Sequence, residues 1–94
     1  MLNNIKHTLH ALVDEAEDDL NAEQVEIALK QGFEIIEEYP DDPRGYSCLL
    51  LCFLGDIPIH VVCAPHEDVL IIITVYKPDL SKWHSDYKTR RRRV

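Results

Sequence analysis

Four polar side chains interrupt the apolar segments between residues 33 and 83, and their types suit proton transfer on a phosphate. His60 titrates near neutral pH, so it can act as a general base or acid. Arg44 can donate two parallel N–H bonds to a phosphate. Tyr76 can share a proton or stack on a base, and Thr74 can hydrogen-bond a phosphate oxygen. Together they suit RNA cleavage without a metal, by attack of a ribose 2′-hydroxyl on the neighbouring phosphate.

Each of these residues also has a structural interpretation. His60 can be hydrogen-bonded within a sheet, as buried polar groups usually are. Arg44 can form a surface ion pair with one of the two aspartates that precede it in the turn. Tyr76 and Thr74 are aromatic and β-branched residues of the kind that packs at strand ends. The residue types alone do not decide between the two interpretations.

An amphipathic helix is expected from Leu2 to Ala16, where apolar residues recur at helical spacing. His10 lies on this helix, where it can orient a substrate or supply a second proton-transfer group. The alternative is a solvated histidine one turn before Asp14. His7, His10 and Asp14 can in principle bind a metal, but free spacing on one helix is weak support. We therefore expect no metal site and no cofactor.

A second helix is expected to begin after Asn21 and to end at Gly32. Asn21 can cap the helix, and Gln24 at the third helical position can reach back to complete a capping box. Gly32 suits a left-handed C-terminal cap, where a side chain would be strained. The residues that this helix should bury are Val25, Ala28 and Leu29.

Residues 33–39 predict a half-exposed edge strand, and three longer apolar runs predict an antiparallel meander. Pro78 should end the last strand. The segment from Ser81 to Tyr87 is expected to form a short helical turn that folds Trp83 back onto the core, before a basic tail. The three apolar runs are Tyr46 to Leu54, Ile57 to Ala64 and Val69 to Tyr76.

The predicted fold class is therefore α+β, with two N-terminal helices packed on an antiparallel sheet of three to four strands. Ninety-four residues make one small domain, which is expected to span residues 1–94. Within it, residues 1–32 form the helices, residues 33–76 the sheet, and residues 77–94 the C-terminal segment and tail.

Strand register decides whether His60 and Tyr76 can share a site. A two-residue loop at Gly55-Asp56 sets Leu51 opposite His60 and pairs two cysteines, Cys48 and Cys63. A four-residue loop at 65–68 would set His60 opposite Ile73, with Tyr76 on the other face. One bulge or an odd-length loop reverses that, so the question stays open at the level of sequence.

The net charge of −7 argues against binding nucleic acid by bulk electrostatics. Residues 1–42 hold 12 acids and 2 bases, whereas residues 43–94 hold 5 acids and 8 bases. The tail, Arg90, Arg91, Arg92 and Arg93, can track RNA phosphates, anchor an acidic partner segment or serve as a solubilising end. Without a leader or a long apolar run, the protein is expected to be cytoplasmic, with no membrane contact and reduced cysteines.

The ordered segments resemble a family of small uncharacterised prokaryotic domains that is grouped with the RelE, MqsR and barnase-like ribonuclease toxins. The segments are IIEEYPDDPRG, SCLLL, PIHVV with His60, IITVYKPD with Thr74 and Tyr76, and the KW segment before the arginines. His10-Ala11 matches the family's N-terminal element. The resemblance implies a RelE-like fold and the toxin of a type II toxin–antitoxin pair, acting as a metal-independent mRNA endonuclease. It also implies a cognate antitoxin, often with a zinc-binding N-terminal part.

Two other functions remain open beside the endonuclease. One is a catalytically silent interaction module on the same scaffold, including a homodimer. The other is a thiol switch through Cys48 and Cys63, which requires exposed thiols of low pKa. Clustering of Arg44, His60 and the tail would favour the nuclease, whereas a packed His60 and an Arg44 paired with Asp42 would favour the interaction module.

Overall fold

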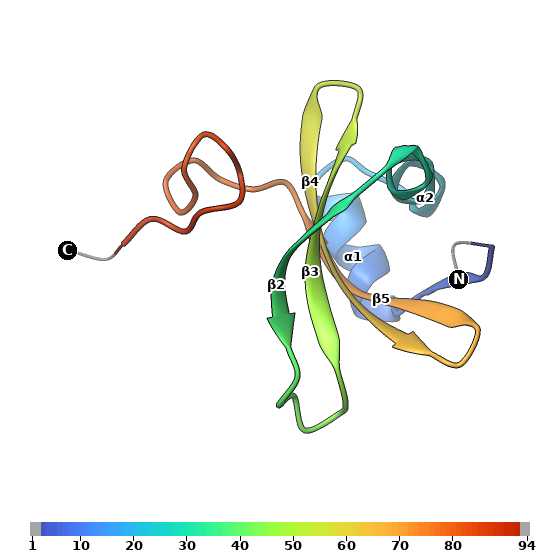
Figure 1. Ribbon diagram of the computed structural model, residues 1–94. Coiled ribbons are helices and arrows are strands. Elements are labelled where there is room, and N and C mark those ends of the chain that lie inside the picture. The colour runs from blue at the N-terminus through green and yellow to red at the C-terminus, as the bar shows by residue number, and fades with distance from the viewer. Residues whose placement is uncertain (1–2, 93–94) are drawn as a thin grey trace.

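The computed structural model describes residues 3–92 and contains one five-stranded sheet with two helices. The strand order is β1-β5-β4-β3-β2, and β1 runs parallel to β5 while the other neighbours are antiparallel. Figure 1 shows both helices on one side of the sheet and the C-terminal segment on the other. In chain order the elements are β1 (Ile5–His7), α1 (Leu9–Glu17), α2 (Ala22–Gln31), β2 (Glu34–Tyr39), β3 (Ser47–Leu54), β4 (Ile57–His66) and β5 (Val69–Tyr76).

The predicted fold class was wrong, because the sheet is mixed and has five strands rather than three to four antiparallel ones. The extra strand, β1, lies where the first half of a helix was expected, and Ile5 pairs with Leu70 of β5. Thr8 then starts α1: its backbone is extended, and its hydroxyl accepts a hydrogen bond from the Ala11 N–H. Leu2, the predicted start of the helix, lies outside the described residues. The apolar residues do recur at helical spacing, but Ile5 lies in a strand that pairs with β5, and the helix begins only after the Thr8 cap.

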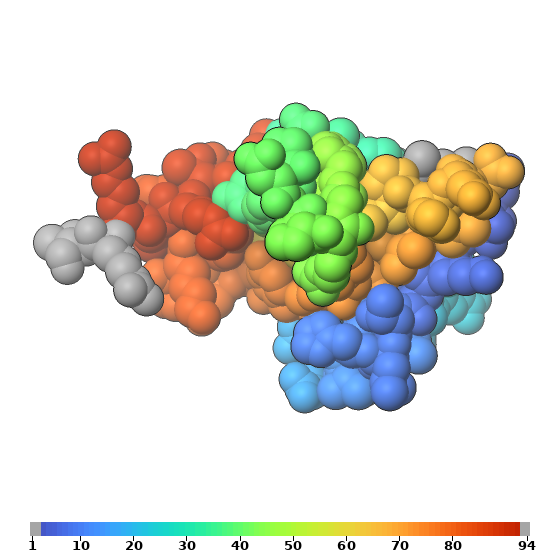
Figure 2. Space-filling view, turned by 90° about the horizontal axis from the view of Figure 1, so that it is seen from below, coloured from blue at the N-terminus to red at the C-terminus, as the bar shows by residue number. Residues whose placement is uncertain are grey.

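The orientation of α1 also differs from the prediction. Ala11 and Glu15 are buried, whereas Leu9, Leu12 and Val13 are exposed. Figure 2 shows this blue part of the chain projecting from the body of the molecule. An apolar stripe of α1 therefore faces outward.

The second helix agrees with the prediction at its N-terminal cap and in its buried face. Asn21 and Gln24 form the capping box, each side chain accepting a hydrogen bond from the other residue's backbone N–H. The three predicted core residues are buried. The helix ends at Gly32 as predicted, but the φ of 132° and ψ of 151° of this residue are not those of the predicted left-handed cap; the positive φ still favours glycine. α2 packs on β3, so local sequence signals positioned this element correctly.

The meander and the first predicted register are confirmed. Leu51 lies opposite His60 and Cys48 opposite Cys63, while β2 is an edge strand. The register that required a four-residue loop at 65–68, which the sequence left open, does not occur. β4 continues to His66, the loop is only two residues long, and a bulge follows Val62. His60 therefore lies opposite Tyr76 rather than Ile73, so both share one face of the sheet.

The helices and the facing side of the sheet enclose the hydrophobic core. On the other side lies the C-terminal segment, residues 77–92, in which the predicted helical turn is replaced by turns and a bridge between Trp83 and Arg90. Trp83 is 3 % exposed, which agrees with its predicted return toward the sheet. None of the helices in residues 3–92 is long and apolar enough to cross a membrane.

Candidate functional site

His60 lies fully buried on β4, and both of its ring nitrogens contact polar atoms of the protein. Nε2 is 2.7 Å from the Tyr87 carbonyl oxygen, and Nδ1 is 3.1 Å from the Tyr76 hydroxyl. A carbonyl oxygen can only accept, so Nε2 carries a hydrogen. Burial lowers the pKa of His60 and favours the neutral ring. Nδ1 then accepts the hydrogen bond that the Tyr76 hydroxyl donates.

Aromatic rings and an unusual backbone conformation hold this pair in place. The rings of Trp83 and Tyr76 meet the imidazole edge to face, with centroids 4.5 and 5.1 Å away. Tyr87 has a φ of 60°, which is uncommon for an aromatic residue. Burial raises the pKa of Tyr76, so its hydroxyl stays protonated at neutral pH. The arrangement fixes both the His60 tautomer and the direction of the Tyr76 O–H.

Arg90 supplies a cation beside this pair. Its guanidinium donates to both carboxylate oxygens of Glu37, at 2.6 and 3.0 Å, and lies 4.5 Å above the Trp83 ring. The hydrogen bond with Glu37 raises the pKa of Arg90 and lowers that of Glu37. The two charges of this pair act in opposite directions on the pKa values of His60 and Tyr76: Glu37 raises both, and Arg90 lowers both.

A hollow of about 450 Å³ opens beside Tyr76 on this side of the molecule. Three cations line it: Lys77, Lys82 and Arg90. Two carboxylates also contribute, but each accepts a backbone hydrogen bond. Asp18 binds the Lys77 N–H at 2.7 Å, and Asp79 binds the Ser81 N–H at 2.9 Å. The hollow therefore lies beside a buried phenol–imidazole pair, and its wall carries three cations and two carboxylates.

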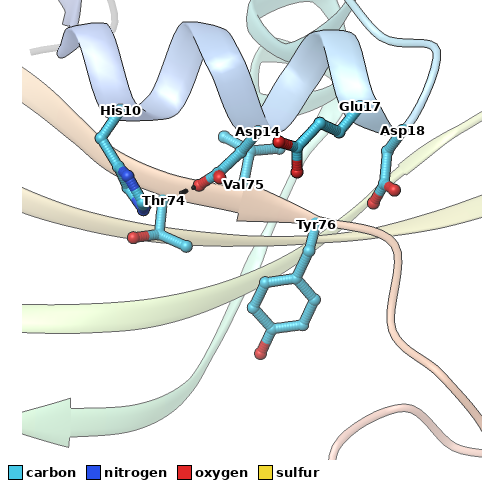
Figure 3. A pocket seen from close by; sticks show the side chains of 7 residues that line it. All are labelled: His10, Asp14, Glu17, Asp18, Thr74, Val75 and Tyr76. Atoms are coloured by element: carbon cyan, nitrogen blue, oxygen red, sulfur yellow. Dashed lines mark ion pairs between the residues drawn. The ribbon is translucent and has the colours of Figure 1, made fainter.

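A second, smaller hollow of about 200 Å³ lies between α1 and β5. His10 extends toward Thr74, and its Nε2 is 3.2 Å from an Asp14 carboxylate oxygen (Figure 3). The Tyr76 ring points away from α1, so its hydroxyl does not face His10. Tyr76 thus stands between the two hollows. The complete lining is His10, Asp14, Glu17, Asp18, Thr74, Val75 and Tyr76.

Arg44 lies apart from this cluster, in the turn between β2 and β3. Its Nε is 3.4 Å from Asp42 Oδ1, and its backbone N–H donates to the same oxygen at 3.0 Å. The two bonds from Arg44 lower the pKa of Asp42. The side chain of Arg44 is 79 % exposed. This is the surface ion pair that stood as the alternative to phosphate binding.

The arginine tail divides into residues with different surroundings. Arg90 binds Glu37, and Arg91 Nε donates to the Leu80 and Trp83 carbonyl oxygens at 2.6 and 3.1 Å. Arg92 lines a further hollow with Arg90 and Arg91. Arg93 lies outside the described residues. Arg90 and Arg91 are thus integrated into the fold of the C-terminal segment.

Sequence reasoning missed Lys77, Lys82 and Trp83 as site residues, along with the Tyr87 carbonyl. Lys77 directly follows Tyr76, and Lys82 precedes Trp83, so a cationic residue beside each aromatic was a usable signal. A backbone carbonyl has no signal in sequence. Its position depends on how the whole C-terminal segment folds over the sheet.

The cysteines do not meet the requirements of a thiol switch. Cys48 and Cys63 are neighbours with sulfur atoms 3.8 Å apart, but they are only 6 % and 1 % exposed. Burial raises the pKa of Cys63, and that of Cys52 to about 12, which disfavours the reactive thiolate. Within residues 3–92, no three histidine, cysteine or acidic side chains gather as metal ligands would.

Comparisons with known proteins yield one match. No curated protein and no solved structure matches the chain. A family model described as a domain of unknown function (DUF4258) matches residues 7–77. That range runs from β1 through β5 and includes His10, His60, Thr74 and Tyr76. The chain belongs to the DUF4258 family.

Proposed function

We propose that this protein is an RNA endonuclease that cleaves by attack of a ribose 2′-hydroxyl on the neighbouring phosphate. One observation carries the proposal: the Tyr76–His60 pair lies at a hollow lined by three cations. The reaction needs a base for the 2′-hydroxyl, stabilisation of the phosphorane and a proton for the leaving 5′-oxygen. Side chains of the hollow supply these functions without a metal ion.

Tyr76 and His60 act together as the base. As the 2′-hydroxyl attacks phosphorus, its proton passes to the Tyr76 oxygen, while the Tyr76 proton passes to His60 Nδ1. Tyr76 touches the substrate and is the catalytic residue, whereas the buried His60 acts through it. After the reaction His60 Nδ1 returns a proton to the Tyr76 oxygen as Tyr76 releases its own proton to water, and the lysine that protonated the 5′-oxygen takes up a proton from water. Proton transfer of this kind contributes about 10²- to 10⁴-fold to a rate.

The cations of the hollow stabilise the phosphorane. Arg90 is held rigidly by Glu37 and Trp83, so it can donate toward the hollow with little loss of conformational freedom. Lys82 and Lys77 add positive charge, and an ammonium beside the leaving 5′-oxygen can protonate it. Within the described residues neither lysine has an ion pair.

His10 and Thr74 have a supporting role in this account. They lie on the α1 side of β5, away from the Tyr76 hydroxyl. They are therefore placed to orient the nucleotide beyond the cleaved bond. The family resemblance adds the biological setting: a toxin that is neutralised by a cognate antitoxin, with a zinc-binding N-terminal part on that partner.

The test is cleavage of a single-stranded RNA by the purified protein in the presence of a chelator. The expected products carry a 2′,3′-cyclic phosphate and a 5′-hydroxyl, because the 2′-oxygen forms the new bond. The same RNA with a 2′-deoxynucleotide at the cleaved position should stay intact there. Absence of cleavage by folded protein, on RNA pools of varied sequence, would contradict the proposal.

An interaction module is the second candidate, and specific observations favour it. Leu9, Leu12 and Val13 form an exposed apolar stripe on α1, Arg44 is paired with Asp42, and His60 is packed. Such a stripe on a helix is typical of a protein contact. Sedimentation of the protein and of Leu12→Asp would decide whether the stripe mediates a homodimer: only the native chain should self-associate.

A further inference from the structure

Two neighbouring hollows at the C-terminal segment share two lining residues. The hollow beside Tyr76, about 450 Å³, and its neighbour, about 560 Å³, are both lined by Lys82 and Arg90. We call this combined feature the strap groove. It extends from Tyr76 to the end of the described chain, and its five cations are Lys77, Lys82, Arg90, Arg91 and Arg92.

A backbone network positions the cations of the strap groove. The Arg91 N–H donates to the Lys82 carbonyl at 2.9 Å, and the His84 N–H donates to the Thr89 carbonyl at 2.8 Å. Asp86 accepts from the backbone N–H groups of Lys88 and Thr89. The segment is therefore a closed hairpin-like loop that carries Lys82, Arg90 and Arg91.

Some charged groups of the groove have hydrogen-bond or ion-pair partners within the protein, and others have none among the described residues. Its two carboxylates already accept backbone hydrogen bonds, and Arg90 has Glu37 as its partner. Among residues 3–92, Lys82 and Arg92 have no ion pair. A protein of net charge −7 thus maintains a local cluster of cations in a groove. Such a cluster raises the local concentration of a polyanion.

Carboxylates lie next to the cations of the strap groove at two places. Glu34 and Glu37 of β2 lie at one of them, where they bind Lys88 and Arg90. Glu17 and Asp18, at the end of α1, line the hollow on the other side of Tyr76. A single phosphate backbone needs only the cations of the groove, whereas the second strand of a duplex would bring further phosphates toward Glu17 and Asp18. Repulsion by these carboxylates discriminates against the wrong ligand.

We infer that the strap groove binds the phosphate backbone of single-stranded RNA, excludes duplexes and leads the strand to Tyr76. The inference deepens the proposed function, on which it rests for the choice of RNA. Sequence-independent binding of a single strand combines such a cationic groove with aromatic surfaces. Trp83 at the base of the groove supplies rigidity beneath Arg90.

The test is a binding measurement that needs no cleavage. A fluorescent 2′-O-methyl oligonucleotide lacks the attacking hydroxyl, so its anisotropy reports affinity alone. Lys82→Glu and Arg92→Glu should each weaken binding about 10-fold or more, and each lost phosphate contact should reduce the salt slope by about 0.7. Lys6→Glu on β1, which makes the same charge change outside the groove, should bind like the native chain.

The duplex form of the same oligonucleotide should bind at least about 10-fold more weakly than the single strand, because its second strand brings phosphates toward these carboxylates. Equal affinity of the groove variants and the native chain would overturn the inference, as would equal weakening by Lys6→Glu or preference for the duplex. Circular dichroism melts confirm that each variant is folded. If the native chain cleaves RNA but the groove variants bind as tightly as it does, the groove inference is refuted and the nuclease proposal stands. If the variants bind more weakly but the native chain does not cleave, the nuclease proposal is refuted and the groove inference stands.

Discussion

At the scale of single residues, His60 illustrates how burial changes what a histidine can do. Its type suggested a solvent-facing acid or base, but the ring is enclosed and both nitrogens have partners. Its chemical role can then pass only through the Tyr76 hydroxyl. A buried residue of this kind also links its protonation to folding.

The pH dependence of stability follows from that linkage. Burial lowers the pKa of His60 in the folded state, so the unfolded chain binds the proton more readily. The contribution of His60 to stability is therefore fully present at pH values above the pKa of an unfolded histidine, about 6.5. As the pH falls from there toward the folded pKa, this contribution is lost, by at most about 1.4 kcal/mol per pH unit. Urea unfolding at pH 7.5 and 5.5 should show a larger loss for the native chain than for His60→Gln.

Glutamine is a suitable control because it can still donate to the Tyr87 carbonyl and accept from Tyr76, but it does not titrate. The comparison between the two proteins removes the contribution of the other four histidines. Equal loss of stability in both proteins would show that His60 is not the titrating group. It would also remove the assignment of a neutral His60 that accepts from Tyr76.

At the scale of elements, a buried histidine joins β1 to both helices. His7 Nδ1 is 2.6 Å from a Glu15 carboxylate oxygen, and Nε2 is 3.0 Å from a Glu26 oxygen. Each ring nitrogen thus lies within hydrogen-bond distance of a carboxylate oxygen from a different helix. This network holds the parallel strand that sequence periodicity did not predict.

A double-mutant cycle tests the network. His7→Gln should cost about 3–5 kcal/mol of unfolding free energy, because it removes the partner that His7 provides for the buried Glu15 carboxyl group. Adding Glu15→Gln should recover much of the loss, since two amides can satisfy one another. Urea titration of the native chain, both single variants and the double variant measures the coupling. Additive effects would mean that the two side chains do not interact as described.

At the scale of the whole molecule, the C-terminal segment and the sheet should unfold together. Trp83, the single tryptophan of the chain, packs against His60 and therefore reports this contact by fluorescence. Far-UV circular dichroism reports the sheet and the helices. In urea the two signals should share one midpoint, as expected for a single cooperative domain. A tryptophan transition at lower urea would show that the segment detaches independently.

Features that depend on neighbouring residues were predicted from the sequence, whereas features that depend on distant residues were missed. The capping box of α2 and the loop at Gly55-Asp56 depend on neighbouring residues, and both appear as expected. β1 depends on a partner more than sixty residues away, so helical periodicity was misleading there. The bulge after Val62 changed the face of Tyr76, and no residue in the segment specifies it.

The candidate site was predictable to a similar extent. The sequence singled out His60 and Tyr76 as isolated polar residues, and the structure brings them within 3.1 Å. Arg44 was grouped with them by type alone, but a nearby aspartate provides its partner. The cations that do lie beside Tyr76 come from the C-terminal segment, whose path over the sheet follows from tertiary packing.

The rate of RNA cleavage by Tyr76→Phe tests the central claim most directly. Phenylalanine keeps the ring but removes the hydroxyl, so cleavage should fall about 10²-fold or more while the fold is retained. Tyr46→Phe is the matched control, because its hydroxyl binds Glu38 on the exposed surface; this variant should cleave like the native chain. A Tyr76→Phe protein that cleaves at the native rate would contradict the assignment of Tyr76 and His60 as the catalytic pair.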